Sequence, residues 1–132
     1  MHELKIREVK RSEINSDVLR RMTRGKTSIA KYFLANFQFR DVGIAHIGVY
    51  EPPGPIFIYH LYVIAEYRSM GFGSKLLDTV EQFARENGNP TLELEPGQID
   101  LTFPVSQVEA WYQQRGYQPS PEDVRKYRKY IN

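Results

Sequence analysis

The sequence contains no cysteine among its 132 residues. Disulfide bonds, cysteine nucleophiles and cysteine-based metal sites are therefore excluded. Its three histidines, at positions 2, 46 and 60, lack the spacing of metal ligands, so no metal site is predicted. There is no signal-peptide pattern, and no apolar run approaches the roughly 20 residues that cross a bilayer. We expect a soluble, cytoplasmic protein that does not act at a membrane.

Apolar residues make up 41% of the chain and charged residues 26%, as in ordinary globular proteins. The length is that of one domain, so residues 1–132 are expected to form a single unit. Basic residues crowd the N-terminal end. A nucleic-acid surface is one interpretation of this crowding, but no nucleic-acid motif accompanies it, and a solvated helix face is favoured. The basic residues concerned are Lys5, Arg7, Lys10, Arg11, Arg20, Arg21, Arg24 and Lys26.

Hydrophobic periodicity predicts strands and helices in alternation. The segment 56–64 is almost wholly apolar or aromatic, which is typical of a central strand covered on both faces. Segments 31–39 and 42–50 read as a hairpin that turns at Arg40-Asp41. Further strands are predicted at 4–9, at 91–95 and near the C-terminus, and a loop at 96–104.

Three helices are predicted between the strands. The first begins at Ser12, carries its apolar stripe on Ile14, Val18 and Met22, and stops at Gly25. The second runs from about residue 73 to 87, with Glu81 off its apolar face. The third follows a capping box formed by Ser106 and Glu109. The fold class is α/β (mixed α+β): one twisted mixed sheet of about six to seven strands, flanked by about three helices.

The stretch RSMGFGS (68–74) lies between the central strand and the second helix. Glycines at a helix start let an anion approach unpaired backbone N–H groups, and Arg68 adds a cation at the rim. Gly71 and Gly73 match neither the Walker loop nor the complete dinucleotide fingerprint. The spacing alone leaves two interpretations open, a phosphate site and a tight turn before a helix.

The wider segment LYVIAEYRSMGFGSKLL (61–77) resembles the acetyl-CoA-binding segment of the GNAT superfamily of N-acetyltransferases. The family pattern is L-x-V-x-x-x-x-R/Q-x-x-G-x-G/A-x-x-L-L. A second family element, an aromatic-Tyr-x-x-x-Gly-aromatic segment, is matched by WYQQRGY (111–117). The resemblance covers roughly residues 30 to 118. The first pattern is matched by Leu61, Val63, Arg68, Gly71, Gly73, Leu76 and Leu77, and the second by Trp111, Tyr112, Gly116 and Tyr117.

The resemblance implies a GNAT-like acyltransferase domain whose sheet splays open at the cofactor site. It implies that the strand edge at Leu61, Tyr62 and Val63 pairs with the pantetheine arm of acetyl-CoA. The pyrophosphate would lie on the loop formed by Arg68, Ser69, Met70, Gly71, Phe72, Gly73 and Ser74.

The resemblance also implies a reaction, the transfer of acetyl to an amine without a covalent enzyme intermediate. Tyr112 matches the family tyrosine that acts as general acid; its other interpretation is an aromatic core residue, as we interpret Trp111 and Tyr117. The general base stays open. His60 can accept a proton near pH 7, and strand alternation turns it away from the Leu61 face. Glu93, Glu95 and a water chain are the alternatives.

Two functions therefore compete. The first is an acetyl-CoA-dependent N-acetyltransferase acting on a small-molecule amine or a protein amino group. The second is a catalytically inactive GNAT-fold binding or regulatory protein. Val105 stands where the family often has a polar residue before the late helix, which departs from the pattern. The segment between the first strand and the hairpin is short, so the acceptor site is expected to be open or completed by a second copy in a homodimer.

Overall fold

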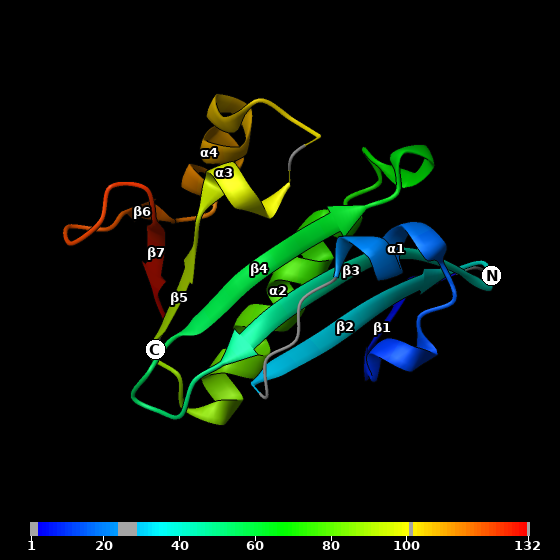
Figure 1. Cartoon of the computed structure of the whole chain (residues 1–132), viewed down its shortest axis with the longest axis horizontal. Coiled ribbons are helices and arrows are strands. Elements are labelled where there is room, and N and C mark those ends of the chain that lie inside the picture. Colours follow the sequence, from blue (N-terminus) through cyan, green and yellow to red (C-terminus); the bar gives the residue numbers. More distant parts are fainter. Residues whose placement is uncertain (1–2, 24–28, 101, 132) are drawn as a thin grey trace.

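A single seven-stranded sheet runs through the part of the protein that the computed structural model describes, residues 3–23, 29–100 and 102–131 (Figure 1). The strand order is β1-β2-β3-β4-β5-β7-β6. Only β4 and β5 run parallel, and the other neighbours are antiparallel. This confirms the predicted mixed sheet. The strands are β1 (Lys5–Val9), β2 (Ala30–Phe37), β3 (Arg40–Val49), β4 (Ile56–Val63), β5 (Thr91–Leu94), β6 (Gln118–Pro119) and β7 (Tyr127–Tyr130).

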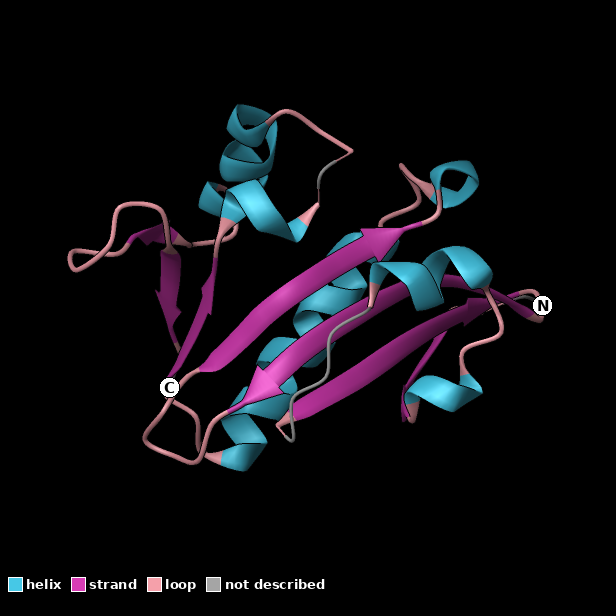
Figure 2. Ribbon diagram, viewed as in Figure 1, coloured by secondary structure: helices cyan, strands magenta, loops and turns pink. Residues whose placement is uncertain are grey.

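Helices cover both faces of this sheet (Figure 2). Helix α2 (Phe72–Asn87) packs its apolar stripe on one face and makes the larger core with β2 to β5. Helix α1 (Asp17–Met22) lies on the opposite face over a smaller core. Helices α3 (Pro96–Ile99) and α4 (Val105–Gln113) follow β5 and pack together at one end of the molecule. The predicted helix at 73–87 is confirmed.

The predicted first helix is wrong in extent and phase. A short 3-10 turn, Arg11–Glu13, comes first, and α1 begins only after Ser16. The Ser16 hydroxyl accepts the backbone N–H of Leu19, which satisfies a first-turn donor and fixes the start there. In this phase Leu19 is buried, while Val18 is 38% exposed. The predicted stop at Gly25 lies outside the described residues.

Three other local predictions are corrected. The capping box at Ser106 does not form, because the N-cap of α4 is Pro104, two residues before Ser106, and the helix has no side-chain cap. The hairpin between β2 and β3 turns at Gln38 and Phe39, whose φ angles are 53° and 65°. Two consecutive left-handed residues match the right-handed twist of a hairpin, although neither is glycine. The loop predicted at 96–104 contains α3.

A buried polar cluster joins α2 to the outer strands of the sheet. Glu81 was predicted to lie off the apolar face of α2, but it is only 6% exposed. It accepts the hydroxyl of Tyr117 at 2.8 Å, and Lys129 on β7 lies 3.2 Å from both carboxylate oxygens. Burial of this carboxylate is tolerated because it is paired and hydrogen-bonded. Tyr117 therefore combines packing with a hydrogen bond that the sequence did not predict.

Part of the basic N-terminal set is used within the fold. Arg11 donates to the backbone carbonyls of Arg20 and Thr23 at the end of α1, and Arg7 lies 3.7 Å from Glu13. Arg24 and Lys26 lie outside the described residues. Among the helices that are described, none is long and apolar enough to span a bilayer.

Candidate active site

Strand β4 pairs with β5 only through its first three residues and then continues beyond the end of β5. The parallel ladder joins Ile56–Ile58 to Leu92–Leu94. Just beyond it, the pairing of β4 with β3 shifts register, so that Tyr59 is an extra residue between Ile58 and His60. Such a bulge bends a strand and increases its twist. Over Leu61–Val63 no described strand pairs with β4 on the β5 side, which leaves a backbone edge open to a ligand.

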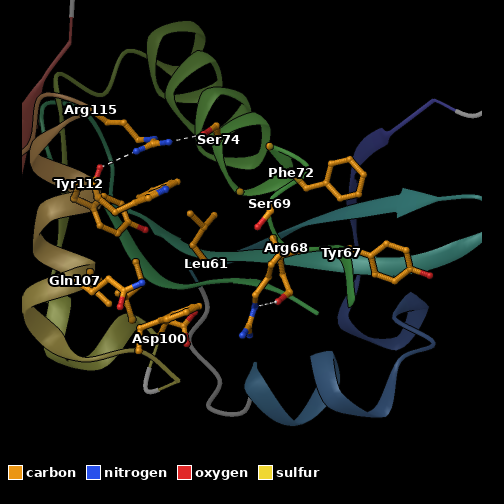
Figure 3. Close-up of a pocket in the computed structure, with 17 residues that line it drawn as sticks. Leu61, Tyr67, Arg68, Ser69, Phe72, Ser74, Asp100, Gln107, Tyr112 and Arg115 are labelled. Atoms are coloured by element: carbon orange, nitrogen blue, oxygen red, sulfur yellow. Dashed lines mark hydrogen bonds between the residues drawn. The ribbon is translucent and has the colours of Figure 1, made fainter. Parts of the chain in front are cut away.

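A cavity of about 570 Å³ occupies this gap, a volume typical of small-molecule sites. It extends from the free edge of β4 to the start of α2 and to α4 (Figure 3). Eight of the ten residues predicted to bind the cofactor line this cavity. The other two do not: Tyr62 packs against the smaller core, under α1, and Met70 is exposed. The eight that line it are Leu61, Val63, Arg68, Ser69, Gly71, Phe72, Gly73 and Ser74.

The start of α2 forms a cradle that fits an anion. Gly71 is the N-cap with a left-handed φ of 81°, and no side chain caps the helix. The first-turn N–H groups therefore have no partner within the helix and carry its positive dipole end. A Cβ built on Gly71 would meet no protein atom within 4 Å, so the space beside this glycine is open to a ligand.

Two arginines line the cavity, and only one lies at the cradle. Arg68 donates from Nε to the Val63 carbonyl at 2.9 Å. Its guanidinium packs between the rings of Tyr62 and Phe103 and extends away from α2 in Figure 3. Its buried Nη2 has no hydrogen-bond partner among the described residues.

The cation at the cradle is Arg115, which was not predicted from the sequence. It donates to the Ser74 hydroxyl at 2.7 Å and to the Trp111 carbonyl at 2.9 Å. The guanidinium carbon lies 3.6 Å from the Trp111 ring centroid. The sequence contained one indication of this contact: the spacing of Trp111 and Arg115 places them one helical turn apart. Trp111, expected only to pack, thus also supports a charged group at the cavity.

Tyr112 lies on α4 and lines the cavity with its side chain almost fully enclosed, at 3% exposure. Burial raises the pKa of its hydroxyl, the nearby Asp100 carboxylate raises it further, and Arg115 opposes the change. The phenol is therefore protonated throughout the neutral range. None of the described residues forms a hydrogen bond with this hydroxyl, so it can donate to a ligand. Asp100 and Gln107, which share the cavity (Figure 3), were also not predicted.

Two of the three candidate base residues lie around a second hollow, of about 260 Å³, next to β4 and α3. His60 and Glu95 both line it. Burial lowers the pKa of His60, and Asp100 opposes this, so the ring is neutral at pH 7. Glu93 does not line the hollow, and its carboxylate is bound by Arg128 at 3.0 Å. Among the described residues, no group of three or more His, Asp or Glu side chains could hold a metal ion.

Comparison with known proteins identifies the family. A family model described as "Acetyltransferase (GNAT) family" matches residues 23–117. The chain belongs to this family. The match spans the free β4 edge, the glycine cradle and Tyr112. In the described part of the chain, the seven-stranded mixed sheet with four α-helices has the GNAT fold. No significant match is found among curated protein sequences.

Solved GNAT structures share this fold at low sequence identity. A GNAT family acetyltransferase from Elizabethkingia anophelis, solved with acetyl-CoA bound, is 12% identical with a TM-score of 0.74, covering 97% of this chain and 98% of its own. The ribosomal-protein-S18-alanine N-acetyltransferase from Escherichia coli is 13% identical with a TM-score of 0.75, covering 98% and 95%. The IAA acetyltransferase from Bacillus cereus is 17% identical with a TM-score of 0.73, covering 98% and 100%.

Proposed function

We propose that this protein transfers an acetyl group from acetyl-CoA to a primary amine by direct attack, with Tyr112 as the general acid. The observation that carries the proposal is one continuous cavity with an anion cradle at one end and a buried, protonated phenol in its wall. Membership of the GNAT family and a structural relative with acetyl-CoA bound support the same donor.

The residues of the cavity fit acetyl-CoA. The first-turn N–H groups of α2 and the guanidinium of Arg115 hold the pyrophosphate, because both are preorganised cationic or dipolar donors. The unpaired edge at Leu61–Val63 accepts the amide-rich pantetheine arm, as a sheet edge accepts an added strand. When bound, the donor supplies a thioester whose carbonyl carbon is attacked and whose sulfur leaves.

Tyr112 gives its proton to the departing sulfur as the carbon–sulfur bond breaks. A general acid must be protonated before the step, and the raised pKa of Tyr112 ensures this at neutral pH. The phenolate then regains a proton from the nitrogen that has formed the amide bond, directly or through solvent.

His60 is the base that we propose for the incoming ammonium. It is neutral at pH 7 and lines the second hollow, whose lining residues differ from those of the donor cavity, so an acceptor bound there can reach it. Glu95 lines the same hollow and is the competing candidate, together with a water chain. The acceptor is a small-molecule amine or a protein amino group. The Escherichia coli relative is, as its name says, an N-acetyltransferase for the alanine of ribosomal protein S18.

Calorimetric titration of acetyl-CoA into the purified protein tests the donor. Ligand at about 100 times Kd should also stabilise the fold by about 2.7 kcal/mol, which a melting curve detects. Release of free thiol in the presence of a panel of primary amines and N-terminal peptides then tests transfer. Binding with no transfer to any amine would favour the catalytically inactive alternative. Absence of binding at millimolar acetyl-CoA would refute the proposal.

A further inference from the structure

The imidazoles of His46 and His60 form a hydrogen-bonded pair across β3 and β4, and no step proposed above uses His46. We propose that His46 is a positioning residue: it accepts a hydrogen bond from Nδ1–H of His60 and so leaves the electron pair of His60 on Nε2. This inference rests on the proposed function, in which His60 takes the proton of the acceptor amine.

The geometry permits only one kind of bond between the two rings. Their Nδ1 atoms are 3.1 Å apart, and the ring planes are nearly parallel, with 5.3 Å between centroids and 19° between planes. His46 and His60 are directly opposed in the β3–β4 ladder, next to the Tyr59 bulge. In a hydrogen bond between two neutral imidazoles, one nitrogen carries the proton and the other accepts it. The tautomer of each ring is therefore set by the other.

Burial and contacts with two aromatic rings fix the position of the His46 imidazole. It is 4% exposed, it stacks on Tyr32 with 4.7 Å between centroids and 15° between planes, and the Tyr59 ring lies 5.1 Å away. Burial first, then His60 and Arg11, lower the pKa of His46 to about 4. The ring thus stays neutral at physiological pH and can offer an electron pair.

Charges on the neighbouring elements orient the bond. The donor ring of a hydrogen bond becomes partly positive and the acceptor ring partly negative. Asp100, at the end of α3, acts on His60 and favours positive charge there, whereas the cationic Arg11 acts on His46 and disfavours it. Together these fields favour His60 as donor and His46 as acceptor.

The chemical consequence concerns the other nitrogen of His60. With Nδ1 protonated and bonded to His46, Nε2 is the unprotonated atom and lies on the side of the ring away from His46. It takes one proton from the ammonium, and the resulting imidazolium keeps its Nδ1–H bond to His46 until Nε2 releases the proton to solvent. The opposite tautomer would place an N–H at Nε2, which cannot accept a proton.

Long-range nitrogen–proton NMR of the 15N-labelled free protein tests the pairing without any activity assay. Nitrogen shifts distinguish protonated from unprotonated ring nitrogens. We expect His60 to carry its proton on Nδ1 and His46 to carry its own on Nε2. A protonated Nε2 on His60 in the wild type would overturn the inference, even if acetyl transfer were demonstrated.

Two variants test the catalytic consequence. His46→Phe keeps the ring and its stacking on Tyr32 but removes the acceptor, whereas His46→Asn restores an acceptor oxygen. We expect His46→Phe to lower kcat at least about tenfold, with KM for acetyl-CoA unchanged, and His46→Asn to recover part of the loss. An unchanged kcat in His46→Phe would refute the role. If the wild type transferred no acetyl, the proposed function would fail while the tautomer result still stood.

Discussion

Gly71→Val tests the anion cradle, and the protein contains its own matched control. Gly71 and Gly88 are the N-cap and C-cap of the same helix, with φ of 81° and 84° and ψ of 10° and 15°. A Cβ at either position makes no close contact, since the nearest atom to that of Gly88 is a Pro52 carbon at 3.8 Å. The two substitutions therefore impose the same backbone strain, but only one lies at the cavity.

The strain sets the expected loss of stability. A left-handed conformation costs an L-residue about 1–2 kcal/mol, which for a domain of this size lowers the melting temperature by roughly 4–8 °C. Both variants should show this loss. At the cradle, the valine methyls should also separate the pyrophosphate from at least one backbone N–H. A hydrogen bond to a charged group contributes about 1.5–3 kcal/mol, so acetyl-CoA should bind about 10- to 200-fold more weakly.

Calorimetric titration and thermal melting of both variants decide the matter. We expect equal melting temperatures and a large difference in Kd, with Gly88→Val close to the wild type. Wild-type affinity in Gly71→Val would show that the cradle does not hold the donor. Equal weakening in both variants would assign the effect to helix stability instead.

Three further outcomes are expected. Tyr112→Phe should leave the Kd for acetyl-CoA unchanged and lower kcat by about 10- to 10,000-fold, because a general acid is lost; full activity would remove Tyr112 from the chemistry. Arg115→Gln should weaken acetyl-CoA binding and reduce its dependence on salt, measured by titration at two ionic strengths, and an unchanged salt dependence would show that this cation does not face the donor. His46 should make the fold acid-sensitive: its pKa is about 4 in the folded protein, against an ordinary value of 6.5, so the unfolded chain binds more protons between these limits. The free energy of unfolding should then fall by about 2–3 kcal/mol as the pH drops from 6.5 to 4, and denaturant titrations of His46→Phe should show a flatter profile.

The sequence predicted the central elements of the fold well because their patterns were long and unambiguous. The apolar run of β4 and the 16-residue periodicity of α2 leave few alternatives to a buried strand and an amphipathic helix. Shorter elements were less predictable, because a single hydrogen bond decides their limits. The Ser16 cap sets the start of α1 about one turn after the start predicted at Ser12.

The sequence could predict the site only where its residues lie in one continuous segment of the chain. The glycine loop and Tyr112 stand in continuous motifs, so their places at the cavity could be anticipated. Arg115 could not be assigned to the cradle from sequence, because its position depends on how α4 packs against the start of α2. The pairing of His46 with His60 depends on strand register, which the hydrophobic pattern does not fix to the residue beside a bulge.

The buried cluster of Glu81, Tyr117 and Lys129 has a mechanical consequence for the gap between β4 and β5. The first three residues of β4 pair with the last three of β5, and the cluster ties β7 to α2, which itself packs on β4. Strands β4 and β7 are thus both held to α2. We therefore infer that the gap between β4 and β5 is already open in the ligand-free protein. A preorganised opening avoids the free-energy cost of ordering on binding. We therefore expect the donor to associate in one kinetic step whose observed rate rises linearly with concentration.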